Sequence, residues 1–237
     1  MRKFGNTGME IKRVGFGGIP IQRISQEDTN KVIDELEKCG VNFIDTARGY
    51  TISEEYLGNA LKGRREKFYI ATKSMSRDYE SMKRDIEISL KNLQTDYIDL
   101  YQMHNVKPAE YDTIFGEDRA YRALLEAKEA GKIKHIGITS HGLETVEKAV
   151  ESGKFETIQF PYNIVENQAD EVFKKAHEKG VGTIVMKPLA GGAIDDGTLA
   201  MKYILSREYI DVAIPGIDTP EQVRENTAVL ANFELTE

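Results

Sequence analysis

Eight short apolar runs alternate with eight longer amphipathic segments along the 237 residues, and this alternation predicts an α/β protein folded as a (β/α)8, or TIM, barrel. Strict strand–helix alternation indicates parallel strands joined by right-handed crossover connections. The chain length also fits, because such barrels typically contain about 250 residues. An open doubly wound sheet is the alternative, but that fold usually has only about five or six strands.

The predicted strands are short and apolar, and several of them end on a polar residue. In chain order they are VGFGG (14–18), NFIDT (42–46), FYIATK (68–73), YIDLYQMH (97–104), IKHIGIT (133–139), TIQFPY (157–162), GTIVMK (182–187) and VAIPG (212–216).

Between the strands, apolar residues recur at spacings of three and four, which predicts amphipathic helices. In chain order the helices cover residues 25–40, 53–63, 78–93, 119–132, 143–153, 167–180, 197–207 and 219–232. A glycine just past the last turn is expected to end three of them, at Gly40, Gly131 and Gly180. Ser53 and Thr219 are predicted N-caps, and a proline follows Thr219 at the first helical position.

A short N-terminal β-hairpin is expected before the first barrel strand, with RKFG and EIKRV on either side of the turn NTG (6–8). We expect this hairpin to plug the bottom of the barrel. The sequence contains no linker, low-complexity tract or second domain, so we predict one barrel domain over residues 1–237.

The composition is that of a globular protein and argues against several classes of partner. Hydrophobic residues make up 40% and charged residues 30% of the chain, whose net charge is -7. This negative charge argues against binding nucleic acid or coating an anionic membrane. No apolar run approaches the roughly 18–20 residues that span a bilayer, and the N-terminus lacks a signal-peptide core. Cys39 is the one cysteine, so we expect no disulfide within the chain and no metal site. Together these features predict a cytoplasmic protein. They leave the oligomeric state open.

Ionisable side chains end three consecutive predicted strands. Asp45 ends the second, Lys73 the third and His104 the fourth, while Tyr50 lies in the loop after Asp45. Alone, a strand-end Asp is usually a turn former or a helix cap. The C-terminal ends of all barrel strands, however, face one mouth, where active sites are built. Three ionisable groups that converge there predict a catalytic centre.

The chemistry that fits these residues is the reduction of a carbonyl group. Hydride addition produces an alkoxide, which needs a proton from a nearby acid. Tyrosine, with a pKa near 10, is a weak donor, and a neighbouring lysine ammonium lowers that pKa. A carboxylate keeps the lysine charged, and a histidine can orient the carbonyl oxygen. These four roles fall on Asp45, Tyr50, Lys73 and His104.

The motifs around these residues resemble those of the aldo-keto reductases. They are IDTARGY with SEEYLGNAL, IATK and TDYIDLYQMH, and the likeness runs from GFGG near residue 15 to REN at 224–226. The resemblance implies an aldehyde or ketone substrate and a nicotinamide cofactor bound across the barrel mouth, with NADP(H) favoured and NAD(H) possible. The segments MKPLAGGA and DTPEQVREN most resemble a microbial branch whose members often carry a cysteine-rich, ferredoxin-like tail. This sequence ends at ELTE without that tail, and whether the natural protein continues stays open.

The same resemblance implies which residues hold the cofactor. Ser140 and Gln159 match the contacts to the nicotinamide carboxamide, His141 replaces a usual asparagine, and Met186 stands where many relatives stack a tyrosine on the ring. The segment LAGG matches the one that wraps the pyrophosphate. The remaining implied contacts, most of them toward the pyrophosphate and adenosine, are Gly18, Lys187, Pro188, Leu189, Gly191, Gly192, Gly216, Asp218, Gln222, Glu225 and Asn226.

Cofactor choice and substrate scope stay open. Many relatives place a lysine and an arginine on the 2′-phosphate, where this chain has Gly216 and Gln222, and Arg224 is expected on a different helical face. In the long loop 105–118, Tyr111 and Phe115 either line the pocket or anchor the loop.

Two rival functions remain. A barrel lysine, Lys73 or Lys187, can form a Schiff base, although Asp45 would keep Lys73 protonated. A non-catalytic nucleotide-binding regulatory subunit is the second alternative.

Overall fold

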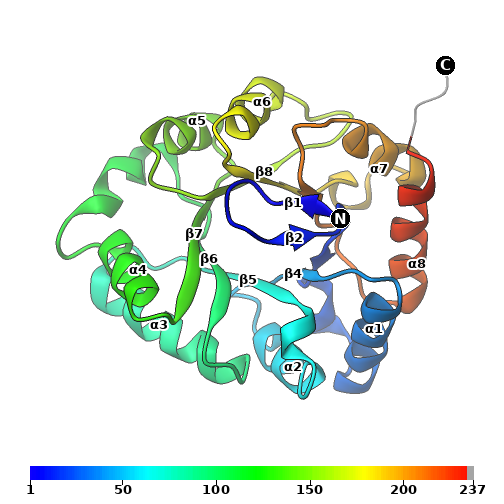
Figure 1. Cartoon of the computed structure of the whole chain (residues 1–237), viewed down its shortest axis with the longest axis horizontal. Helices are drawn as coiled ribbons and strands as arrows, with labels where there is room; N and C mark the ends of the chain where they lie inside the picture. Colours follow the sequence, from blue (N-terminus) through cyan, green and yellow to red (C-terminus); the bar gives the residue numbers. More distant parts are fainter. Residues whose placement is uncertain (234–237) are drawn as a thin grey trace.

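A computed structural model describes residues 1–233, in which eight parallel strands curl into a barrel with helices around them (Figure 1). Each strand pairs with the next one along the chain, as the alternation of elements predicts. The strands are β3 (Phe16–Gly17), β4 (Phe43–Asp45), β5 (Tyr69–Ser74), β6 (Ile98–Met103), β7 (Ile133–Thr139), β8 (Thr157–Pro161), β9 (Gly182–Met186) and β10 (Val212–Ala213). The ending ELTE (234–237) lies outside the described residues.

The first and last strands meet through two single bridges, which close the barrel. One parallel bridge joins Val14 to Ala213 and the other joins Gly17 to Gly216. The Gly17 amide donates a hydrogen bond to the Pro215 carbonyl at 2.9 Å. A Cβ atom on Gly17 would lie 2.7 Å from that oxygen, so this close backbone approach requires glycine. Because these contacts are single bridges, β3 and β10 are shorter than the predicted runs 14–18 and 212–216.

Helices follow the strands at all eight predicted positions and form the outer layer of the barrel (Figure 1). They are α1 (Gln26–Lys38), α2 (Ser53–Ala60), α3 (Tyr79–Asn92), α4 (Ala120–Glu129), α5 (Leu143–Ser152), α6 (Asp170–Glu178), α7 (Gly197–Leu205) and α8 (Pro220–Ala228). Short 3-10 turns stand beside them: η1 (Pro20–Arg23), η2 (Arg65–Lys67), η3 (Pro108–Phe115), η4 (Ala190–Gly192) and η5 (Val229–Ala231). No helix within residues 1–233 is both long and apolar enough to cross a membrane.

The predicted helix caps are confirmed except at Ser53. Thr219 caps α8, and its hydroxyl accepts a hydrogen bond from the Gln222 amide at 3.3 Å. Gly40, Gly131 and Gly180 have positive φ angles of 68°, 74° and 72°, as helix-ending glycines do. The prediction for Ser53 was wrong, because α2 begins at Ser53 itself. Its hydroxyl binds Thr46 and the Gly18 carbonyl instead, a tertiary role that local sequence does not reveal.

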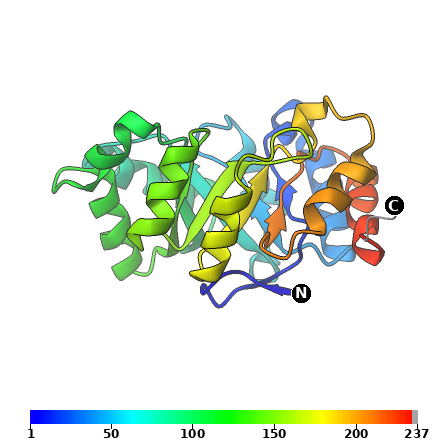
Figure 2. The same cartoon turned by 90° about the horizontal axis from the view of Figure 1, so that it is seen from above.

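The N-terminal hairpin closes the bottom of the barrel, as predicted. Its strands β1 (Arg2–Lys3) and β2 (Glu10–Ile11) lie across the barrel in Figure 1, and Figure 2 shows them at the end away from the loops that follow the strands. Phe4, Met9 and Ile11 of this segment are buried with residues of the barrel interior such as Phe43. The Phe4 and Phe43 rings meet edge to face with centroids 5.4 Å apart. The lower half of the interior is therefore apolar.

Gly58 marks a close contact between α2 and the C-terminal end of α3. A Cβ atom at this position would lie 2.1 Å from the Asn92 carbonyl oxygen and 2.9 Å from the Leu93 carbonyl carbon. Both atoms belong to the backbone, so a side chain here would force the two helices apart.

We expect Gly58→Ala to lower the free energy of unfolding by about 1–3 kcal/mol, because it overpacks this helix contact. Urea denaturation of both proteins measures the change. Gly49→Ala is the matched control, since a Cβ atom at Gly49 meets no heavy atom within 4 Å. If both variants unfold at the parental urea concentration, the close α2–α3 contact is not present in solution.

Candidate active site

Three strand ends bring the four predicted catalytic side chains to one end of the barrel. Asp45 is the last residue of β4, Lys73 lies in β5, and His104 follows β6. Tyr50 comes from the loop between β4 and α2. The Lys73 Nζ atom lies 2.5 Å from Asp45 Oδ2 and 5.1 Å from the centroid of the Tyr50 ring. The Tyr50 and His104 rings meet edge to face, with centroids 6.0 Å apart and an interplanar angle of 85°.

The Lys73–Asp45 ion pair is almost completely buried, with relative exposures of 1% and 2%. Lys73 also donates to the Thr46 carbonyl at 2.8 Å, and Asp45 Oδ1 accepts from Gln102 Nε2 at 3.2 Å. Burial lowers the pKa of Lys73, but the neighbouring Asp45 and Tyr50 groups raise it more, so its net pKa lies above the usual value. Lys73 therefore keeps its proton. The sequence did not indicate Gln102, whose role depends on the register between β5 and β6.

The net pKa of Tyr50 lies above its usual value, although Lys73 lowers it as the sequence predicted. Burial raises the pKa of the phenol most strongly, the Lys73 ammonium lowers it in part, and the Asp45 carboxylate raises it. Lys73 thus acts in the expected direction, but burial reverses the net sign. The phenol is protonated at neutral pH and can serve as a proton donor.

His104 is a neutral imidazole. Burial, together with the charges of Lys73, Arg77 and His141, lowers the pKa of His104 to about 3. Among residues 1–233, its buried Nδ1 atom has no hydrogen-bond partner. A neutral ring retains one N–H group, which can donate to a carbonyl oxygen without competing with Tyr50 for the proton.

The residues matched to the nicotinamide carboxamide lie on β8 and beyond the end of β7. The Ser140 amide donates to the Gln159 carbonyl at 3.2 Å. Gln159 is buried, and its Oε1 atom has no partner among residues 1–233. The Ser140 hydroxyl is already engaged, since it donates to the Val106 carbonyl at 2.6 Å. His141 is exposed, and its Nδ1 atom lies 2.9 Å from Asn105 Oδ1.

The segment matched to the pyrophosphate has an unusual backbone. Lys187, Ala190, Gly191 and Gly192 all have positive φ angles, from 49° to 94°. A Cβ atom on Gly191 or Gly192 would meet nothing within 4 Å, so the backbone there is open to an approaching group. Such turns can present backbone amides to anionic oxygens. Met186 is partly buried at the end of β9 and packs against the inner core, and Pro188 next to this turn is buried.

A cavity of about 380 Å³ lies between the turn after β9 and the helices α7 and α8. Five of its lining residues were expected to contact the cofactor: Leu189, Gly216, Gln222, Glu225 and Asn226. Gly197, Thr198 and Val229 also line it, and the sequence offered no signal for them.

Asp218 and Gly18, which were also predicted to contact the cofactor, do not line this cavity. Asp218 donates its amide to Gln222 Oε1 at 2.8 Å. Gly18 lies beside the catalytic side chains instead, because its amide donates to the Asp45 carbonyl at 2.8 Å.

Arg224 points away from this cavity, as expected from its helical face. Its guanidinium lies 3.2 Å from Glu35 Oε1 of α1 and also pairs with Glu221. No lysine or arginine of the described chain is among the lining residues, whereas the Glu225 carboxylate is.

Tyr111 and Phe115 anchor the 105–118 segment. Tyr111 is buried, and its ring meets the Phe115 ring edge to face at 5.3 Å. Phe115 in turn packs against Tyr121 of α4 at 5.1 Å. Of the two alternatives left open by the sequence, these contacts support the anchoring role. The structure also forms η3 where the sequence predicted only a loop.

The sequence is similar to those of known proteins. The model of the Aldo/keto reductase family matches residues 13–199, and the chain belongs to this family. It is 27% identical to L-galactose dehydrogenase from Arabidopsis thaliana over 99% of this chain and 89% of that protein. It is 26% identical to NADH-specific methylglyoxal reductase from Escherichia coli, over 98% of this chain and 94% of that protein.

Solved structures agree with this assignment. A structure of an aldo-keto reductase from Bacillus halodurans in its holo form superposes with a TM-score of 0.87 and 26% identity, covering 99% of this chain and 92% of that one. A candidate aldo-keto reductase from Pseudomonas aeruginosa gives a TM-score of 0.88 at 26% identity, over 98% and 94% of the two chains. The chain is therefore an oxidoreductase that acts on carbonyl groups, in a family that uses nicotinamide cofactors.

The lowered pKa of His104 and the raised pKa of Tyr50 predict that the rate of the chemical step is independent of pH over a wide range. His104 stays neutral above its pKa of about 3, and Tyr50 stays protonated because its pKa is raised. We expect the single-turnover rate of aldehyde reduction to be constant from about pH 5 to 9 and to fall only as the pH rises through the pKa of Tyr50, above the usual value of about 10. Stopped-flow measurement with saturating reduced nucleotide tests this.

The variant Lys73→Met provides a second test in the same experiment. It lacks the ammonium group, which is the charge that lowers the pKa of Tyr50, so the pH at which the rate falls should be still higher. An inflection near pH 6.5 in the parent would contradict the neutral state of His104.

Proposed function

We propose that this chain reduces an aldehyde or a ketone with a reduced nicotinamide nucleotide, and that Tyr50 donates the proton. The buried ion pair beside Tyr50 carries this proposal, because Lys73 lies 2.5 Å from Asp45 and 5.1 Å from the Tyr50 ring centroid. A buried cation against a phenol stabilises the phenolate that remains after proton transfer. The family membership supports the reaction class but leaves these residue roles to experiment.

Each of the four side chains has one role in this mechanism. The reduced nicotinamide, when bound, supplies the hydride for the carbonyl carbon. Tyr50 transfers its phenolic proton to the carbonyl oxygen, which becomes the hydroxyl group of the product. Lys73 stabilises the resulting phenolate, and Asp45 holds the lysine in place and charged. The neutral His104 donates its N–H group to the carbonyl oxygen and orients it toward Tyr50.

The described residues fit a nicotinamide nucleotide across the barrel mouth. The unpartnered Oε1 atom of Gln159 is an acceptor suited to a carboxamide N–H group. The open backbone at Gly191 and Gly192 suits the pyrophosphate, and the cavity of about 380 Å³ suits the adenosine. Ser140 is the weakest of the expected contacts, because its hydroxyl already donates to the Val106 carbonyl and accepts from the Gly142 amide.

The Schiff-base alternative is poorly supported. A Schiff-base lysine must be uncharged to attack a carbonyl, whereas Lys73 bonds to Asp45 and to the Thr46 carbonyl. Borohydride treatment with an aldehyde but without nucleotide tests it, and a covalent adduct on Lys73 would favour it. A regulatory subunit would bind the nucleotide without turnover.

We expect Tyr50→Phe to slow single-turnover reduction of a reactive aldehyde by about 10²–10⁴-fold, because it removes the general acid. Lys73→Met and Asp45→Asn should also slow the reaction while nucleotide binding survives. The Asp45/Tyr50 double variant should lose far less than the product of the single losses, since the residues act as one unit.

Tyr79→Phe is the matched control for the loss of a hydroxyl group. The Tyr79 hydroxyl binds Glu126 on the outer helices, 2.6 Å away, so this variant should reduce the aldehyde at the parental rate. Parental activity in Tyr50→Phe would remove Tyr50 as the acid, and with it the assignment of all four residues.

The lining of the adenosine cavity bears on cofactor choice. The family resemblance favours NADP(H), yet the described lining holds no cation and includes the Glu225 carboxylate. A 2′-phosphate would therefore find no charged hydrogen-bond donor there, and such contacts are worth about 1.5–3 kcal/mol each. We infer that NADPH and NADH are both accepted.

We expect the dissociation constants for NADPH and NADH to differ by well under about a thousandfold, or 4 kcal/mol. Quenching of nicotinamide fluorescence during titration measures both constants. Arg224→Gln should leave their ratio unchanged, because Arg224 pairs with Glu35 and Glu221 outside the cavity. A large preference for NADPH that disappears in Arg224→Gln would show that Arg224 turns inward to bind the phosphate. Binding of neither nucleotide would overturn the proposed function.

A further inference from the structure

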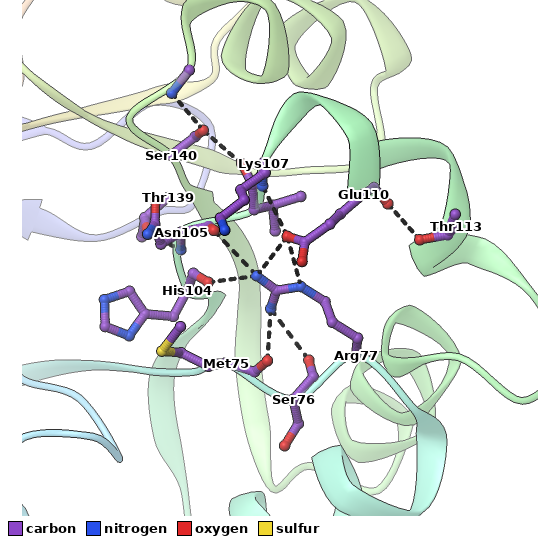
Figure 3. Close-up of polar contacts among 12 residues, drawn as sticks. Met75, Ser76, Arg77, His104, Asn105, Lys107, Glu110, Thr113, Thr139 and Ser140 are labelled. Carbon is purple, nitrogen blue, oxygen red and sulfur yellow. Dashed lines mark hydrogen bonds and ion pairs between the residues drawn. The ribbon is translucent and has the colours of Figure 1, made fainter.

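Arg77, in the loop between β5 and α3, binds the backbone on both sides of the peptide that follows His104 (Figure 3). Its Nη2 atom donates to the His104 carbonyl at 2.8 Å and to the Asn105 carbonyl at 3.2 Å. Its Nη1 atom donates to the carbonyls of Met75 at 3.0 Å and Ser76 at 3.4 Å. One planar guanidinium therefore ties the end of β6 to the loop after β5.

The same guanidinium also contacts η3. Nε and Nη2 lie 3.4 Å and 3.3 Å from Glu110 Oε2, and that oxygen accepts a hydrogen bond from the Lys107 amide at 3.0 Å. All three guanidinium nitrogens of Arg77 are thus engaged. Arg77 is not a free cation that could bind an anionic substrate.

In the described part of the chain, no hydrogen bond to Nδ1 orients the His104 ring, so the position of its backbone matters for the direction of the ring. Its buried Nδ1 atom has no partner among residues 1–233, and its aromatic contact is the edge-to-face approach to Tyr50. The His104 amide donates to the Ser74 carbonyl at 2.9 Å, and Arg77 binds the carbonyl of the same residue. The backbone is thereby fixed at both ends of this one residue.

The backbone turns sharply just after His104. Asn105 has a φ angle of 50°, in the left-handed region, which asparagine adopts more readily than most other non-glycine residues. The Asn105 amide donates to Thr139 Oγ1 at 2.7 Å, and Arg77 binds its carbonyl. Arg77 therefore binds the carbonyls on both sides of this left-handed turn.

We propose that Arg77 is a positioning residue for His104: it holds the backbone on both sides of this turn so that the imidazole faces the reacting carbonyl oxygen. This inference rests on the proposed role of His104 in orienting the substrate. The rival explanation is that Arg77 merely anchors η3 through Glu110.

A double-mutant cycle between Arg77 and His104 tests the proposal. Arg77→Lys keeps the positive charge but loses the planar fork, and we expect kcat/KM for an aldehyde to fall about 10- to 100-fold, the size of effect that small misplacement produces. The Kd of the reduced nucleotide should stay within twofold. In a His104→Gln background the same change should have almost no further effect, because Arg77 acts through His104.

Two other variants separate positioning from general damage. Glu110→Gln removes the charge that binds Arg77 to η3 but leaves the His104 contact, so kcat/KM should fall less than threefold. Arg122→Lys is the matched control, since Arg122 pairs with Glu117 and Glu126 on the outer surface, and it should behave like the parent. If Arg77→Lys does not fold, Arg77→Gln replaces it in the cycle, because its amide keeps two donors for the carbonyls.

The outcomes distinguish this inference from the function on which it rests. A parent protein that reduces no aldehyde, or a fully active His104→Gln variant, would overturn the proposed role of His104 and the inference with it. An active parent in which Arg77→Lys slows both backgrounds equally would overturn the positioning role alone. So would a loss in Glu110→Gln as large as that in Arg77→Lys.

Discussion

The buried pair of Lys73 and Asp45 is the interaction on which the candidate active site depends. An unpaired buried charge costs several kcal/mol, so each residue is tolerated only because the other lies beside it. The Thr46 carbonyl and the Gln102 amide supply further hydrogen bonds to the pair. Adjacent parallel strands make this possible, because β4 and β5 carry the two residues to the same end of the barrel. Burial keeps His104 neutral with help from the charge of Lys73, and the same charge partly offsets the effect of burial on Tyr50.

The barrel interior is divided into two halves with different physical tasks. The lower half is apolar and is filled by Phe4, Met9 and Ile11 of the hairpin together with strand residues. The upper half holds Asp45, Lys73, Gln102 and Gln159, all nearly inaccessible to solvent. Charges interact more strongly where water is excluded. The apolar lower half helps to exclude water from below and so supports the polar layer above it. Loop residues add further contacts around this polar layer. Arg77 binds the backbone of the turn after His104, and Tyr111 and Phe115 anchor the segment that follows it.

Much of this architecture could be predicted from local sequence, and the errors have identifiable causes. Thr219 caps its helix because the capping contact involves residues only three apart, which any local pattern contains. Ser53 looks equally suitable, but its hydroxyl bonds to Gly18, which is 35 positions away in the chain. The lowering effect of Lys73 on the pKa of Tyr50 was predicted correctly, because the neighbouring lysine can be inferred from a motif. The depth of burial, which raises that pKa above its usual value, cannot be inferred in this way. Ser140 matches a cofactor contact by position, yet its hydroxyl donates to the carbonyl of Val106, which is 34 positions away in the chain.

The sequence by itself determined the order of strands and helices, the ionisable residues that end three consecutive strands, and the family to which these motifs belong. Such information lies in periodicities and short motifs, where the interacting residues are close along the chain. Only the tertiary structure decided that Gln102 supports Asp45, that Arg77 binds the backbone around His104, and that the Ser53 hydroxyl bonds to the Gly18 carbonyl. These facts depend on the register between strands and on which face of each element is buried. Both are set by packing between segments far apart in sequence, and no single stretch of residues encodes them.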